Sequence, residues 1–271
     1  MDVPPGTRGI LNPSEGLSRF GLQRVEPADD LAPFLDRHWI VRWDLRGAPP
    51  HEQETLPHPC CHLAFEPARS AVHGVGTKRF VARLEGRGRV VGTKFQPAGL
   101  AAFWPEPNGR ITDCVIPVDR AFGQRGAALA ADVLACDEDA RAVALVEQFL
   151  RERAPAPSEP MRLANELVRL AQSDRSITRA EELARAASLS VRSLQRLFER
   201  HVGVGAKWVI QRARVQEAAE RAAGGARVDW AALAQELGYH DQAHFIREFK
   251  AQVGQTPAAY GARCASGAGP R

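Results

Sequence analysis

The sequence has few cysteines, few lysines and no long hydrophobic run, and these scarcities exclude several classes of protein. No stretch approaches about 18 consecutive apolar residues, which excludes a membrane-spanning helix. The segment Met1–Ile10 lacks the basic start and apolar core of a secretory signal. The five cysteines are odd in number and irregularly spaced, unlike a disulfide framework. We therefore expect a cytoplasmic protein with free thiols.

The composition is otherwise that of an ordinary globular protein. Charged residues make up 25% and apolar residues 44% of the 271 positions, which excludes a disordered chain and a coiled-coil rod. Only four of the 36 basic residues are lysines, so the arginine excess by itself says little about nucleic acid. At roughly 150 residues per domain, the length predicts two domains.

Charge is divided unevenly along the chain. Residues 1–154 carry 19 basic and 20 acidic side chains, whereas residues 155–271 carry 17 basic and 12 acidic ones. Within Val191–Arg214 there are six basic residues and one acidic residue. A basic C-terminal half is typical of a protein that binds a polyanion, and a solvated helix face explains the charge equally well.

The pattern of the first 120 residues indicates β-structure. Short runs rich in Val, Phe and Trp, separated by Pro and Gly, predict strands at His38–Leu45, Cys61–Phe65, Arg79–Leu84 and Arg89–Phe95. The tetrapeptide Val-Gly-Thr-Lys occurs twice, at Val75–Lys78 and Val91–Lys94. With a plausible turn between the copies, Lys78–Phe95 is interpreted as a hairpin.

After Ala121 the apolar period becomes helical. Helices are expected over Ala127–Ala135, Ala140–Arg151 and Met161–Ala171, and three prolines between positions 155 and 160 separate the second from the third. The predicted domains are an N-terminal sensor or dimerisation domain over 1–157 and a DNA-binding domain over 158–264, followed by a tail over 265–271. The expected fold class is α+β. It combines a β-rich, possibly cupin-like domain with trailing helices and an all-α domain of two helix-turn-helix units joined by a long helix.

An internal repeat in the last hundred residues is the strongest signal. Leu183-Ala184 and Leu233-Ala234 are equivalent at an offset of 50, and the helix that follows repeats at an offset of 51. In each copy a short helix meets a tight turn, and Ser190 or Asp241 then caps a second helix that a glycine ends. This pattern describes a helix-turn-helix written twice. The segment Gly205–Ala222 predicts a connecting helix of roughly 25 Å, which could hold two recognition helices about one DNA turn apart.

The repeat resembles the DNA-binding domain of the AraC/XylS family of bacterial transcription regulators. Residues Glu236–Lys250 followed by Val253–Tyr260 carry that family's signature, and the match extends from about Leu163 to Ala262. Ser188 stands in the first turn where the family often has Gly, as at Gly238, and serine can adopt that turn at modest strain. The N-terminal half is similar to the variable sensor domains of such regulators, in particular a subgroup with the pattern Leu56–Cys60 and a hairpin at Glu85–Phe95.

Helix geometry selects candidate DNA-binding residues on the first recognition helix. Leu194, Leu197 and Phe198 are expected to face the core, and the opposite face carries Arg192, Gln195 and Arg196. Arginine pairs with guanine and glutamine with adenine through two hydrogen bonds, so base reading is predicted for these three side chains. The alternative is that they are ordinary exposed polar groups.

On the second recognition helix, Phe245 and Phe249 are expected to face inward. The candidates on its outer face are Gln242, Ala243, His244, Ile246, Arg247 and Lys250. Ile246 could touch a thymine methyl or pack against a neighbouring helix, and His244 could bond a phosphate or another side chain. On the connecting helix, Lys207 and Arg212 are candidates for phosphate contacts.

The motif His58-Pro-Cys60-Cys61-His62 raises a metal-binding alternative. Thiolates and imidazoles bind zinc, but no second pair of ligands accompanies them, so no metal site and no cofactor are predicted. Buried structural cysteines are the default interpretation, with a thiol redox sensor as an unproven alternative.

The sequence therefore predicts a non-enzymatic, sequence-specific transcription regulator. Its expected partner is double-stranded DNA, read in two successive major grooves. A small-molecule effector, a second copy of the chain and RNA polymerase are plausible further partners, and no membrane is expected. Two alternatives remain open: a cupin-like metal enzyme or sensor fused to a DNA-binding module, and a nucleoid-type protein that binds without sequence preference. Gln195 and Ile246 argue against the nucleoid-type protein, whose outer faces should carry only Lys and Arg.

Overall fold

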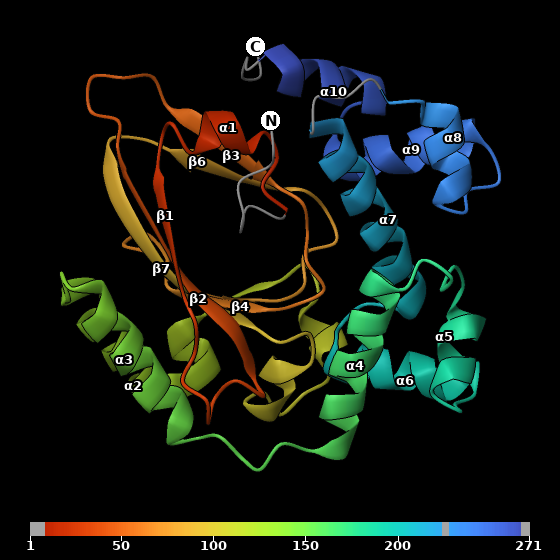
Figure 1. Ribbon diagram of the computed structural model, residues 1–271. Helices are drawn as coiled ribbons and strands as arrows, with labels where there is room; N and C mark the ends of the chain where they lie inside the picture. The colour runs from red at the N-terminus through yellow and green to blue at the C-terminus, as the bar shows by residue number, and fades with distance from the viewer. Residues whose placement is uncertain (1–8, 224–227, 267–271) are drawn as a thin grey trace.

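The computed structural model describes residues 9–223 and 228–266. It contains a β-rich N-terminal half, a pair of packed helices and a helical C-terminal half (Figure 1). This is the α+β architecture expected from the sequence. None of the helices formed by these residues has the length and hydropathy needed to cross a bilayer.

The N-terminal half is built on a six-stranded antiparallel sheet with the order β1-β2-β7-β4-β5-β8. Its central strands are β2 (Leu35–Asp44), β7 (Arg87–Phe95) and β4 (His62–Phe65); at its edges lie β1 (Gly21–Val25), β5 (Ala71–His73) and β8 (Val115–Pro117). A second, two-stranded sheet pairs β3 (His51–Thr55) with β6 (Phe80–Leu84). A short helix α1 (Pro13–Gly16) precedes these strands, and the 3₁₀ turns η1 (Gly99–Ala102) and η2 (Asn108–Ile111) follow β7.

The predicted strands are present, but the hairpin interpretation of Lys78–Phe95 is wrong. The strands β6 and β7 follow one another through Glu85 and Gly86, yet β6 pairs with β3 and β7 pairs with β2 and β4. The long strand β2 offers β7 a register of nine paired positions. Two of them place Trp39 and Trp43 opposite Gly92 and Gly88, which lack the side chain that would collide with each indole. This cross-strand fit favours the pairing of β7 with β2 over a hairpin with β6.

Two helices, α2 (Val118–Ala135) and α3 (Asp139–Arg151), pack on the six-stranded sheet. The carboxylate of Glu147 on α3 accepts a hydrogen bond from the N–H of Ala28 at 2.8 Å and lies 3.3 Å from Nε2 of the buried His38 on β2. The predicted helices at 127–135 and 140–151 fall within these two elements. Residues 154–158 are irregular, as the prolines predicted.

The C-terminal half is entirely helical. It comprises α4 (Glu159–Ser173), α5 (Ala180–Ala186), α6 (Val191–His201), α7 (Ala206–Ala223), α8 (Trp230–Glu236), α9 (Gln242–Val253) and α10 (Pro257–Ser266). The predicted domain end at 264 therefore falls inside α10. Of the tail predicted over 265–271, residues 267–271 lie outside the described part of the chain.

The apolar core crosses the predicted domain boundary. One cluster of buried side chains contains Leu35 and Val91 of the sheet together with Leu167 of α4 and Leu194 of α6. A second cluster joins Leu11 and Leu56 of the N-terminal half to Phe245, Phe249 and other residues of the last four helices. The two halves are thus packed against each other at both ends of α7.

Candidate nucleic-acid interface

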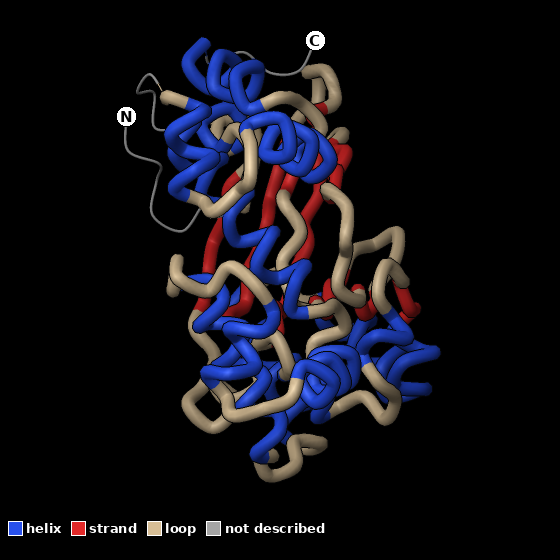
Figure 2. The backbone as a smooth tube through the Cα atoms, turned by 90° about the vertical axis from the view of Figure 1, so that its right-hand side faces the viewer, coloured by secondary structure: helices blue, strands red, loops and turns tan. Residues whose placement is uncertain are grey.

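Two helix-turn-helix units lie at opposite ends of α7 (Figures 1 and 2). The first unit is α5–α6 and the second is α8–α9. The Leu-Ala pairs that revealed the repeat, Leu183-Ala184 and Leu233-Ala234, are all buried. They anchor each short helix in its own core cluster, which confirms the prediction that the Leu-Ala pairs lie on the inner faces of these helices.

The turn in each unit requires a left-handed residue. Ser188 has a φ of +53° in the first unit, and Gly238 has a φ of +72° in the second. The residue after it then donates to the short helix in the same way: Leu189 N–H to the Ala184 carbonyl and Tyr239 N–H to the Ala234 carbonyl, both at 2.9 Å. Serine therefore adopts the glycine-type turn, as the sequence predicted.

Both recognition helices begin at a side-chain cap. The hydroxyl of Ser190 accepts a hydrogen bond from the N–H of Ser193 at 3.1 Å, and the carboxylate of Asp241 accepts one from the N–H of His244 at 2.7 Å. The second bond helps hold the pKa of the Asp241 carboxyl below its ordinary value. Capping satisfies a backbone donor that the helix itself leaves free, so the start of each helix is well defined.

The outer face of α6 is polar and open. Leu194 and Phe198 are fully buried and Leu197 is half-buried, as expected. On the other side Arg192, Gln195 and Arg196 are exposed, and within the described residues none of the three forms a hydrogen bond or an ion pair. Their side chains are therefore available to an outside partner.

The outer face of α9 is more divided. Gln242, Ala243, Arg247 and Lys250 are exposed, and Phe245 and Phe249 are fully buried. Ile246 is half-buried against the second core cluster, so packing uses part of its side chain. His244 lies 3.3 Å from the carboxylate of Glu248 and meets the ring of Tyr239 edge-on.

The connecting helix α7 spans about 27 Å at 1.5 Å per residue and carries Lys207, exposed, in its first turn. The phosphate contact predicted for Arg212 is wrong. This residue is only 2% exposed, and its guanidinium donates to the Pro57 carbonyl at 2.5 Å and to Gln216 at 2.7 Å. Its charge and its place on the connecting helix suggested a phosphate contact, but the N-terminal half covers this face of α7.

A residue that sequence reasoning missed, Arg214, ties the two units together. Its guanidinium donates at 2.8 Å to the carbonyl of Thr178, which directly precedes the first unit, and lies 5.6 Å from the ring centre of Tyr239 in the turn of the second. Nothing in the local pattern distinguishes this arginine from its neighbours, because its partners lie far away in the sequence.

The cysteine-histidine motif is buried rather than assembled into a metal site. Cys60 and Cys61 are 3% and 0% exposed, and burial raises the pKa of both thiols, which favours the unreactive protonated form. His62 lies 3.6 Å from the Cys60 sulfur. Within the residues described, no group of three or more His, Cys, Asp or Glu side chains could hold a metal ion.

Comparison with known proteins identifies two domains. Residues 183–263 match a family described as a helix-turn-helix domain, and residues 23–117 match a domain of unknown function, DUF6597. No curated protein matches the chain.

Similar solved structures include ToxT from Vibrio cholerae O395, with 11% identity, 92% of this chain and 98% of that chain covered, and a TM-score of 0.38. Another is a Vibrio cholerae ToxT with an unsaturated fatty acid bound, with 10% identity, 93% and 94% coverage and a TM-score of 0.37.

Proposed function

We propose that this chain is a DNA-binding transcription regulator of the AraC/XylS type, since residues 183–263 match a helix-turn-helix domain, and that its two recognition helices read DNA. In this proposal α6 and α9 enter two successive major grooves on one face of the duplex. The domain boundary lies in the proline-rich segment, with the DNA-binding part over 158–264.

One observation supports this proposal above all others. Two capped helices, equivalent in the repeat, each present on the face opposite the core polar side chains that form no hydrogen bond or ion pair within the described part of the chain. We assign base contacts to Arg192, Gln195 and Arg196 on α6 and to Gln242, Ala243 and Arg247 on α9. A protein that bound DNA without sequence preference is expected to carry Lys or Arg on these faces, whereas Gln195 and Gln242 can pair with the edge of an adenine.

The remaining candidates make secondary contacts in the proposal. Lys207 and Lys250 approach the phosphate backbone and fix the register of the protein on the duplex. Ile246 offers the unburied part of its side chain to a thymine methyl. His244 contributes a phosphate contact through the part of its ring that Glu248 leaves exposed.

We assign a sensory role to the N-terminal domain and no enzymatic activity. The Nδ1 atom of His62 and the Nε1 atom of Trp39 are buried and find no hydrogen-bond partner among residues 9–223 and 228–266, and the two rings lie 6.2 Å apart. Buried polar atoms of this kind are costly unless something satisfies them, which favours a small polar effector as their partner. We further propose that the protein acts in the cytoplasm, that it pairs with a second copy of itself, and that it contacts RNA polymerase.

Selection from a random-sequence duplex library with the full-length chain tests the proposed function. We expect enrichment of one sequence with two short determinants about one helical turn apart. Binding to that duplex should weaken steeply between 50 and 200 mM salt, with a logarithmic slope near −0.9 for each phosphate contact. Recovery of no preferred sequence, or a flat salt response, would contradict the proposal.

A further inference from the structure

The N-terminal half holds the end of the first recognition helix. The side-chain amide of Asn108 on η2 donates to the carbonyl of His201, the last residue of α6, at 2.7 Å. The hydroxyl of Thr112, just after η2, donates to the carbonyl of Gly203 at 2.5 Å. We call Asn108 and Thr112 the first anchor.

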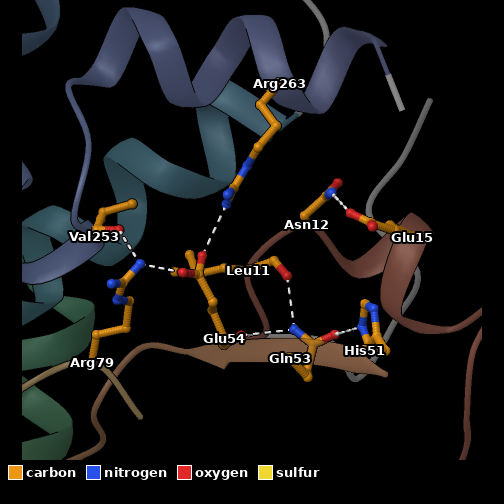
Figure 3. A network of polar contacts seen from close by, with 9 residues as sticks. All are labelled: Leu11, Asn12, Glu15, His51, Gln53, Glu54, Arg79, Val253 and Arg263. Carbon is orange, nitrogen blue, oxygen red and sulfur yellow. Dashed lines mark hydrogen bonds and ion pairs between the residues drawn. The ribbon is translucent and has the colours of Figure 1, made fainter. Parts of the chain in front are cut away.

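It also holds the end of the second recognition helix, as Figure 3 shows. Arg79, at the start of β6, directs one guanidinium nitrogen to the carbonyl of Val253, the last residue of α9, at 3.5 Å. The same nitrogen pairs with Glu54 on β3, and Glu54 pairs in turn with Arg263 on α10 at 3.1 Å. We call Arg79 and Glu54 the second anchor.

The two anchors hold corresponding ends of the repeat, although not the same carbonyl: His201 and Gly203 in the first unit, and Val253, the equivalent of Val202, in the second. The offset of 51 that relates the helices aligns Val202-Gly203 with Val253-Gly254, so both anchors reach the turn that follows a recognition helix. Carbonyl groups at the end of a helix have no partner within it and accept donors readily. The N-terminal half thus treats the two units alike, although its own anchoring residues share no sequence motif.

A short connection joins the anchors. Asp113 directly follows Thr112, and its carboxylate accepts hydrogen bonds from the N–H and the hydroxyl of Thr77, each at 2.7 Å. The N–H of Asp113 donates to the carbonyl of Val75 at 2.9 Å. Thr77 lies two residues before Arg79. This bridge, Asp113 with Thr77, makes one continuous structure from the end of α6 to the end of α9.

We propose that the N-terminal domain sets the spacing of the two recognition helices through this bridge, and thereby selects DNA by the distance between its two determinants. The inference rests on the proposed function, because it presupposes that both helices enter the same duplex. The helix α7 and the contacts of Arg214 join the two units directly. The anchors add a connection through the N-terminal half, which further restrains the rotation of one unit relative to the other. Asn108, Thr112, Asp113 and Arg79 are accordingly positioning residues that act through α6 and α9.

The test uses the full-length chain and the duplex selected above, together with versions in which two base pairs are inserted or removed between the determinants. Such a change rotates one determinant by about 70° relative to the other. The key variant is Asp113→Gly, since it removes the bridging carboxylate, tolerates the φ of +57° at this position and touches neither recognition helix. Thr112→Val removes one anchoring hydroxyl at nearly constant volume.

Asp174→Gly is the matched control. The Asp174 carboxylate accepts hydrogen bonds from the N–H and hydroxyl of Ser176 at 2.8 and 2.7 Å, which is the same pair of donors in a contact within one turn that involves no anchor residue. Circular dichroism and thermal melting establish that each variant is folded.

We expect the wild type and Asp174→Gly to lose affinity at least about tenfold on the altered duplexes, as they would on a mismatched site. Asp113→Gly and Thr112→Val should bind the altered duplexes within about threefold of the original one. Variants that keep the wild-type spacing penalty, or that lose affinity equally at every spacing, would overturn the inference and leave the proposed function intact. A wild type that prefers no duplex would instead refute the proposed function.

Discussion

At the scale of single residues, chemistry and surroundings separate side chains of the same charge. Arg196, Lys207 and Arg212 are all basic and lie on neighbouring helices. Arg196 is exposed on the outer face of α6, Lys207 is exposed at the start of α7, and Arg212 is enclosed and bonded to the N-terminal half. Net charge alone cannot assign these three roles, because only exposure determines which of them can meet DNA.

Replacing Arg196 and Lys207 by alanine should affect DNA binding differently. Arg196→Ala should cost about 1–3 kcal/mol on the selected duplex and relax preference at one base, because a bidentate base contact is lost. Lys207→Ala should weaken binding to all sequences alike and lower the salt slope by about one unit, because only a phosphate contact is lost.

Titrations of both variants against the selected duplex and its single-base substitutions measure these effects. If Arg196→Ala loses the same affinity for every sequence, Arg196 contacts a phosphate and does not read a base. If neither variant changes the affinity for DNA, the proposal that α6 lies in the major groove is wrong.

At the scale of elements, the turn of each helix-turn-helix unit imposes a backbone conformation that side chains resist. Ser188 and Gly238 occupy equivalent positions with positive φ, yet only glycine is free of steric cost there. The first unit therefore stores local strain that the second avoids. Within one chain the two turns provide a built-in comparison.

Exchanging residue types at these turns should change stability in opposite directions. Ser188→Gly should raise the free energy of unfolding by about 0.5 kcal/mol, the strain relieved exceeding the added flexibility of the unfolded chain. Gly238→Ala should lower it by about 1 kcal/mol, since a Cβ there is strained and lies 3.3 Å from Thr178. Urea denaturation measures both, and a stabilising Gly238→Ala would contradict the explanation.

Local signals predicted the elements that local chemistry determines. The capping residues Ser190 and Asp241 and the turn at Ser188 are defined by neighbours in sequence, and the structure confirms all three. The pairing of β6 with β3 was not predictable, because it joins segments about thirty residues apart and competes with the adjacent β7. The burial of Arg212 escaped prediction for the same reason, since its partner Pro57 lies in the other half of the chain.

At the scale of the whole molecule, the two halves share their cores and enclose several histidines. Burial lowers the pKa of His62 to about 3, and burial beside Arg212 lowers the pKa of His58 well below its ordinary value. Both imidazoles are thus neutral in the folded protein at pH 7. The unfolded chain takes up protons on these groups near pH 6.5, and the folded chain does not.

Stability should consequently fall as the pH is lowered from 7.5 to 5.5. A folded pKa below the unfolded one contributes stability that is complete above about pH 6.5 and is lost as the pH falls towards the folded value. His62 should account for about 1 kcal/mol of this loss at pH 5.5, and His58 should add to the loss in the same direction. Urea denaturation of the wild type, of His62→Gln and of the control His240→Gln, whose imidazole is 93% exposed, measures the effect. A pH dependence that His62→Gln leaves unchanged would exclude His62 as its source.

The apolar clusters that cross the domain boundary bear on how such a regulator can evolve. Leu11 and Leu56 complete the core of the last helices, and Leu167 and Leu194 complete the core of the sheet. A gene fusion that supplied either half with a foreign partner would leave these side chains facing a surface that does not match them. Exchange of N-terminal halves by recombination is therefore restricted to relatives whose interfaces match these side chains.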